Sequence, residues 1–124
     1  MNDKLDANLV DVLLNIVIWC DKITGMMDGF DYSRFESDEM AQLALSKSVE
    51  QVGEMSNRVL KKWSDFAGSH SEIRLADAYA MRNRLSHFYV SVDLPILWRT
   101  LKDSIPQMRT QIAETLRADG EALD

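Results

Sequence analysis

The sequence predicts an all-α protein, an antiparallel bundle of four to five helices. Three observations predict this class. Apolar residues recur at intervals of three and four along most of the chain, which is the period of a helix buried on one side. The chain has only two prolines and five glycines, and no stretch alternates as a strand does. Its length of 124 residues suits one core, so residues 1–124 are expected to form a single domain.

The first predicted helix carries one apolar stripe and is expected to end at Gly25. The stretch GMMDGFDYSRFES is rich in Gly, Asp and Ser, and it predicts a loop at about residues 25–36. Cys20, the only cysteine, lies on the apolar side of the helix, so a buried thiol is expected rather than a catalytic one. The stripe comprises Leu5, Leu9, Val12, Ile16, Trp19 and Ile23.

The second predicted helix is long and has Ser37 as its expected N-cap, with Asp38 and Glu39 in the first turn. Gly53 lies in its middle, where glycine costs about 1 kcal/mol of helix stability relative to alanine. A glycine at this place allows a neighbouring helix to approach closely. The apolar positions are Leu45, Val49, Val52, Met55, Val59 and Trp63.

The segment AGSHSE breaks the pattern before a third helix, and Ser69 and Glu72 have the spacing of a capping box. The third helix is expected to run into AYAMRNRLSHFYVSVD, residues 78–93. Asp93 followed by Pro95 then marks a new helix start, because proline is tolerated in a first turn.

The last segment continues the helical spacing, and Pro106 is expected to kink or split it. The tail RADGEALD is expected to be frayed from about residue 118. The apolar positions before it are Leu97, Leu101, Ile105, Met108, Ile112 and Leu116.

The net charge of the chain limits the classes of partner that it is expected to bind. A net charge of -6 argues against broad electrostatic capture of nucleic acid, although it leaves room for a local basic site and suits a protein partner. No apolar run is long enough for a membrane span, and the N-terminus MNDKLDANL lacks the basic region of a signal peptide. A cytoplasmic protein without membrane contact is therefore expected.

The segment at residues 78–93 concentrates Arg82, His87 and Tyr89. On a straight helix, residues five apart diverge by roughly 140°, whereas residues seven apart share a face. The three side chains can therefore line one pocket only if the helix ends or distorts near Ser86. Such a turn is reasonable because a new helix starts at Asp93.

These residue types suit a phosphodiester substrate. The guanidinium of Arg82 can hold a phosphate with two parallel hydrogen bonds. The imidazole of His87 can take the proton from an RNA 2′-hydroxyl or protonate the leaving oxygen. No cluster of metal ligands accompanies them, so neither a metal nor a cofactor is expected. Taken alone, an Arg-x4-His pair also arises by chance, and Arg84 alone reads as a solvated charge.

The wider sequence resembles the HepT family of HEPN-domain ribonucleases, which are toxins of toxin–antitoxin pairs. The stretch MRNRLSHFYVSVDLPILWRTLKDSIPQM has the family's Arg-Asn-x3-His-x-Tyr arrangement, and VEQVGEMSNRVLKKW is similar to its Ile-Gly-Glu-Ala segment. The resemblance implies an all-α HEPN bundle and a homodimer, in which both copies of Arg82 and His87 meet in one cleft. It implies that Arg82 stabilises the phosphate, that His87 is the acid and base, and that Asn83 orients His87 or the RNA. Two copies of Arg82 and Arg84 would raise the local positive potential.

The resemblance also implies a modified residue. Tyr89 matches the tyrosine to which a nucleotidyltransferase-type antitoxin transfers AMP in pairs of this kind, a type VII-like arrangement. The added nucleotide would place negative charge beside His87 and Arg82, where the RNA would bind. A second interpretation treats Tyr89 as an amphipathic residue packed at a helix end.

For three further side chains, the sequence allows both a role at the site and a position in solvent. Glu54 either reaches the motif and holds Arg82 or His87, or it faces solvent. Lys61 and Lys62 either guide RNA or are solvated charges that favour the helix dipole.

Three functions compete at this stage. The first is a metal-independent endoribonuclease toxin with RNA as substrate, for which tRNA and mRNA are the candidates. The second is a non-catalytic accessory or substrate-binding subunit of a nucleotidyltransferase. The third, a purely structural dimerising bundle, leaves the Arg-Asn-x3-His-x-Tyr cluster unexplained. RNA cleavage separates the first from the other two.

Overall fold

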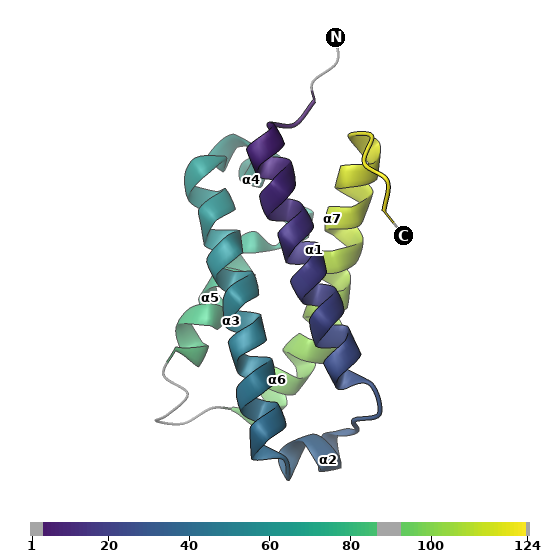
Figure 1. The fold of residues 1–124 in the computed structure, drawn as a ribbon. Coiled ribbons are helices and arrows are strands. Elements are labelled where there is room, and N and C mark those ends of the chain that lie inside the picture. The colour runs from purple at the N-terminus through teal and green to yellow at the C-terminus, as the bar shows by residue number, and fades with distance from the viewer. Residues whose placement is uncertain (1–3, 87–92, 124) are drawn as a thin grey trace.

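The computed structural model describes residues 4–86 and 93–123, which form helices joined by short connections (Figure 1). The long helices are α1 (Ala7–Met27), α3 (Glu39–Lys62), α5 (Leu75–Leu85) and α7 (Ile105–Ala118), and the short helix α6 (Leu94–Arg99) precedes α7. Helix α1 packs against both α3 and α7, and α5 packs extensively on α3. The predicted all-α class is confirmed, and the described part of the chain contains no strand.

The core lies where the apolar stripes of α1, α3 and α7 meet. Cys20 is buried among these residues, and burial raises the pKa of its thiol to about 12. The expectation of a buried thiol is therefore confirmed. The fully buried side chains of the three stripes include Leu13, Ile16, Ile23, Leu45, Val52, Val59, Ile112 and Leu116.

The predicted loop after the first helix was wrong in two respects. Gly25 lies inside the last turn of α1, which ends only at Met27. The short helix α2 (Tyr32–Glu36) then interrupts the expected loop, because Phe35 is fully buried and anchors the segment to the core. The side chain of Asp31 caps α2 by accepting a hydrogen bond from the backbone N–H of Arg34, at 2.8 Å.

The N-cap of α3 is Asp38 rather than Ser37. The Asp38 carboxylate accepts a hydrogen bond from the backbone N–H of Ala41 at 2.9 Å, which satisfies one of the free donors of the first turn. Ser37 instead donates from its hydroxyl to the carbonyl of Arg34. The two residues were both suitable caps by type, and the end of α2 decided between them.

The predicted capping box at Ser69 and Glu72 was also wrong. Ser69 is the last residue of another short helix, α4 (Ser64–Ser69), and its hydroxyl donates to the carbonyl of Phe66. A 3-10 turn over Ser71–Ile73 follows, and Arg74 takes a left-handed conformation with φ 64° directly before α5. No side chain caps the start of α5 in the described structure.

The last segment divides as Pro106 predicts. Asp93 caps α6 by accepting from the backbone N–H of Ile96 at 3.1 Å. A π-helical turn over Thr100–Ser104 then separates α6 from α7, and the N–H of Ile105 donates to the carbonyl of Thr100, five residues back. Pro106 has no N–H to continue the regular pattern, so a change of helical path beside it is expected.

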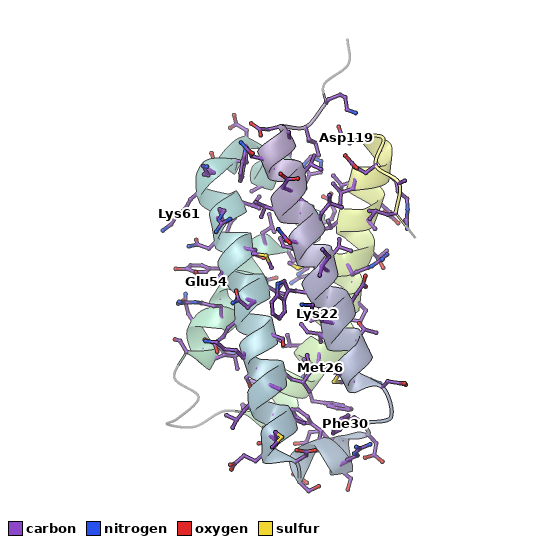
Figure 2. All side chains as sticks on the ribbon, viewed as in Figure 1. Lys22, Met26, Phe30, Glu54, Lys61 and Asp119 are labelled. Atoms are coloured by element: carbon purple, nitrogen blue, oxygen red, sulfur yellow. The ribbon has the colours of Figure 1, made fainter. Side chains whose placement is uncertain are left out.

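The C-terminal tail, which was expected to be frayed from about residue 118, is held against the rest of the structure as far as Leu123. The Asp119 carboxylate accepts a hydrogen bond from the backbone N–H of Leu5 at 2.9 Å, and Leu123 packs against the core. Asp119 lies at the end of the molecule where both termini are found (Figures 1 and 2). No helix in the described segments is both long and apolar enough to cross a membrane.

Candidate functional site

The predicted site lies where α5 meets the middle of α3, and Gly53 determines how close the two helices come. A Cβ atom at Gly53 would lie 2.8 Å from the carbonyl oxygen of Ala78 and 3.1 Å from Cγ of Arg82, and it would overlap Cβ of Arg82. Real Cβ atoms do not approach backbone atoms so closely. The predicted role of this glycine in close helix packing is confirmed, and its partner is the helix that carries the motif.

This close packing places Arg82 beside Glu54. Nε of Arg82 lies 2.5 Å from Oε1 of Glu54, an ion-pair contact whose angle is too bent for a well-aligned hydrogen bond. Nη1 of Arg82 donates to Oδ1 of Asn83 at 3.1 Å. The Arg82 side chain retains a third of its exposure and that of Glu54 about half, so the pair lies at the surface and is accessible to a ligand.

The two contacts orient the guanidinium. Arginine has five N–H donors, one on Nε and two on each terminal nitrogen. Glu54 lies at the Nε donor, and Asn83 takes one donor of Nη1. Three donors, on Nη1 and Nη2, therefore have no partner among the described residues. That number is sufficient for the two parallel hydrogen bonds that bind a phosphate.

The helix that carries Arg82 ends where the motif requires. Helix α5 ends at Leu85, and Ser86 closes it by donating from its hydroxyl to the carbonyl of Asn83 at 2.8 Å. The predicted helix end near Ser86 is confirmed. His87 and Tyr89 lie outside the described residues, so their approach to Arg82 stays a prediction.

The remaining residues predicted for the site differ in the face of the helix on which they lie and in their contacts. Arg84 is exposed, and it lies two residues from Arg82, which on a helix means nearly the opposite face. Lys62 lies over the ring of Trp63, 5.4 Å from its centroid, whereas Lys61 is exposed. The structure thus brings together Arg82, Asn83 and Glu54, and it does not bring Arg84 to them.

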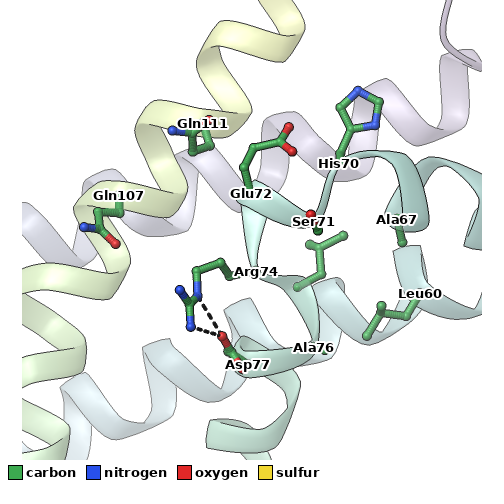
Figure 3. Close-up of a pocket in the computed structure, with 11 residues that line it drawn as sticks. Leu60, Ala67, His70, Ser71, Glu72, Arg74, Ala76, Asp77, Gln107 and Gln111 are labelled. Atoms are coloured by element: carbon green, nitrogen blue, oxygen red, sulfur yellow. Dashed lines mark hydrogen bonds and ion pairs between the residues drawn. The ribbon is translucent and has the colours of Figure 1, made fainter.

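A second feature, a groove at the other end of α5, was missed by the sequence reasoning (Figure 3). The groove has a volume of about 680 Å³. Arg74 and Asp77 form an ion pair at 2.7 Å on its wall. Arg74 precedes Arg82 by eight residues, about 12 Å along a helix, so the groove is separate from the motif. Its other polar lining residues are His70, Ser71, Glu72, Gln107 and Gln111.

Sequence spacing gave no signal for this groove, because its lining comes from α3, α4, the 3-10 turn, α5 and α7, which only the fold brings together. Its acidic and histidine side chains do not form a metal site. Within residues 4–86 and 93–123, no group of three or more His, Cys, Asp or Glu side chains is arranged to hold a metal ion.

Comparison with known protein families shows which family the chain belongs to. Residues 18–115, which include Gly53, Glu54 and Arg82, match the family described as Ribonuclease HepT-like. The chain belongs to the HepT-like family. The resemblance drawn from the motif is therefore confirmed over most of the chain.

Curated relatives support the same assignment. The chain is 33% identical over 78 residues to "Probable ribonuclease HepT" of Thermococcus cleftensis, covering 63% of this chain and 68% of that protein. It is 27% identical over 107 residues to "Putative RNase TTE0752" of Caldanaerobacter subterraneus subsp. tengcongensis, covering 86% and 93%. It is 25% identical over 105 residues to "Putative RNase MJ0125" of Methanocaldococcus jannaschii, covering 85% and 88%. No solved structure gives a significant match.

Proposed function

We propose that this HepT-like protein is a metal-independent endoribonuclease and the toxin of a type VII-like toxin–antitoxin pair. The observation that carries the proposal is the Arg82 guanidinium, held by Glu54 and Asn83 at the end of α5, five residues before His87. The names of the relatives, which call them ribonucleases, support RNA as the substrate.

The proposed reaction is an internal transfer within the RNA. His87 removes the proton of a 2′-hydroxyl, and the oxygen attacks the adjacent phosphorus. The bond from phosphorus to the 5′-oxygen of the next nucleotide breaks, and that oxygen takes its proton from the imidazolium of His87, which returns to the neutral form. The products are a 2′,3′-cyclic phosphate and a 5′-hydroxyl. The free donors of Arg82 bind the phosphate oxygens as negative charge increases on them.

The supporting residues act through this arginine. Glu54 and Asn83 fix the direction in which the guanidinium fork points, so that its terminal nitrogens and not Nε meet the phosphate. Arg84 adds positive potential at the same end of α5. A homodimer that joins two such ends would gather two copies of each arginine, which suits an anionic substrate on a chain with net charge -6.

The proposal includes inhibition by modification of Tyr89. A nucleotidyltransferase-type antitoxin transfers AMP to the phenol of Tyr89, with loss of pyrophosphate from ATP. The new phosphodiester is an anion two residues from His87, and it competes with RNA for the free donors of Arg82.

The test is cleavage of cellular RNA and of tRNA by the purified protein in EDTA, with intact mass used to exclude AMP carried over on Tyr89. Arg82→Ala and His87→Ala are expected to abolish cleavage while the helical circular dichroism is retained. His70→Ala is the matched control. The imidazole of His70 stacks on Phe66 and contacts its carbonyl at 2.9 Å, remote from the motif, and its loss is expected to leave cleavage intact.

The products complete the test. The proposal is supported if RNA with cyclic phosphate ends is produced in EDTA by wild type and His70→Ala, and not by Arg82→Ala or His87→Ala. A folded, unmodified dimer that cleaves no RNA in a broad panel would overturn it and favour the accessory subunit of a nucleotidyltransferase instead. Cleavage that persists in His87→Ala would overturn the assignment of the base.

A further inference from the structure

A row of exposed cationic side chains extends along α3 from the Arg82 site. Arg58 and Lys61 follow Glu54 by four and seven residues, and all three side chains are exposed. At about 100° per residue, these intervals place both cations within roughly 40° of Glu54 around the helix axis. Figure 2 shows Glu54 and Lys61 on the same side of α3.

The spacing of the row suits a nucleic-acid backbone. With a rise of about 1.5 Å per residue, Arg58 lies roughly 6 Å and Lys61 roughly 10 Å beyond Glu54 along the helix. A stacked strand advances by about 3.4 Å per nucleotide, so the row spans about three nucleotides from the site. One row on one helix face meets one phosphate backbone, which favours a single strand over a duplex.

The electrostatic setting of the row differs from that of the rest of the chain. Residues 55–64 contain no acid, although the protein has 20 acids and 14 Lys and Arg. Within the described segments, neither Arg58 nor Lys61 forms an ion pair or lies over an aromatic ring. Other cations do, since Arg109 pairs with Asp21 and Lys22 lies over Trp19.

The opposite direction along α3 provides a matched contrast. Lys47 precedes Glu54 by seven residues and is exposed on the same face, so it lies as far from the site as Lys61 does. Glu50, however, lies between Lys47 and the site on this face and would repel a phosphate. The favourable direction for a polyanion is therefore toward the C-terminal end of α3.

We propose that Arg58 and Lys61 bind successive phosphates of a single RNA strand that leaves the Arg82 site toward the C-terminal end of α3. The inference rests on the proposed ribonuclease function and specifies how that site holds its substrate. Lys62 is not part of the row, because it is turned by a further 100° from Lys61 and lies over Trp63.

The first experiment measures binding without cleavage. A fluorescent 12-nucleotide RNA with 2′-O-methyl groups cannot be cleaved, because its attacking oxygen is blocked, and it is titrated with the full-length protein over a range of KCl concentrations. Each lost phosphate contact to a single strand reduces the salt slope by about 0.7. The double variant R58Q/K61Q is expected to lower the slope by about 1.4 and to weaken binding by about tenfold at 0.15 M salt.

The controls separate this row from net charge and from folding. K61Q alone is expected to lower the slope by about 0.7, whereas K47Q, with the same change in charge, leaves it unchanged. R58K/K61R keeps both charges and retains the wild-type slope. Circular dichroism melting tests whether each variant is folded. If R58Q/K61Q does not fold, the salt slopes of K61Q and K47Q still test the proposal. An unchanged slope in R58Q/K61Q, or an equal loss in K47Q, would overturn the proposal.

A second experiment separates this proposal from the proposed function. Cleavage of a dinucleotide, which is too short to reach Arg58 and Lys61, is expected to be unchanged in R58Q/K61Q, while cleavage of an unmodified 12-nucleotide RNA with free 2′-hydroxyls falls about tenfold. Equal losses on both substrates would overturn the role of the row. If wild type cleaves neither substrate, the ribonuclease proposal fails, and the salt titration still decides whether the row binds RNA.

Discussion

Replacing Gly53 by alanine tests the contact between α3 and α5 that positions Arg82. In an open helix interior this change stabilises a protein by about 1 kcal/mol, because glycine loses more conformational freedom on folding. At Gly53 the new Cβ meets the Ala78 carbonyl oxygen at 2.8 Å and overlaps Cβ of Arg82. Neither atom moves with a change of rotamer, so α5 itself must shift.

The two effects oppose each other, and the overlap is the larger. Overpacking a well-packed contact costs about 1–3 kcal/mol, and the rigid obstacles at Gly53 place this case at the upper end. After the gain of about 1 kcal/mol in helix propensity, we expect a net loss of about 2 kcal/mol. For 124 residues, that loss lowers Tm by roughly 8 °C. A shift of Arg82 by about 1 Å is expected to lower kcat/KM on RNA by about 100-fold.

The assays are urea and thermal unfolding followed by circular dichroism, together with kcat/KM on an RNA oligonucleotide. Gly25→Ala is the matched control, because Gly25 also lies in a long helix and a Cβ there meets nothing within 4 Å. It is expected to stabilise the protein by about 0.5 kcal/mol and to leave activity unchanged. If Gly53→Ala stabilises the protein as Gly25→Ala does, the close approach of α5 is not what requires glycine, and the reasoning is refuted.

Three further changes test other parts of the structure. Glu54→Gln is expected to change the free energy of unfolding by less than about 1 kcal/mol, because its ion pair is half-exposed, yet to lower kcat on RNA about tenfold by releasing Arg82; an unchanged kcat would contradict the orienting role. Asp119→Ala is expected to cost about 1 kcal/mol and to speed hydrogen exchange at the amide of Leu5, whose only described acceptor it removes, and unchanged exchange would argue against that bond. Cys20 has a raised pKa of about 12, so its thiol is neutral in the folded protein, and a disulfide reagent at pH 8 is expected to react only as fast as the protein unfolds. Because the unfolded thiol ionises first, stability is lost by roughly 1 kcal/mol per pH unit between the unfolded pKa of 9.0 and the folded pKa of about 12, and Cys20→Ala should remove that part of the alkaline loss in urea titrations.

The interaction between Glu54 and Arg82 shows where sequence reasoning reached its limit. The sequence offered two interpretations of Glu54, one in contact with the motif and one facing solvent. A separation of 28 residues carries no information on distance until the helices are packed. The packing of α3 on α5 at Gly53 decides between them, because it places the Arg82 side chain at Glu54.

The errors of prediction have a related cause. Ser37 and Asp38 are both good caps, and a local pattern cannot rank them. The short helix α2 forms within a segment of loop-like composition because its Phe35 reaches the core, a gain that depends on distant residues. The groove beside Arg74 likewise depends on elements that are far apart in the sequence.

The sequence by itself determined the all-α class, the end of α5 near Ser86, the division beside Pro106 and the HepT-like motif around Arg82. These features follow from periodicity and from residues with special backbone chemistry, which act over a few neighbouring positions. The tertiary structure alone decided which partners hold Arg82 and which face of α3 adjoins it. Those outcomes depend on the distance between two packed helices, and that distance is set by the missing side chain at Gly53.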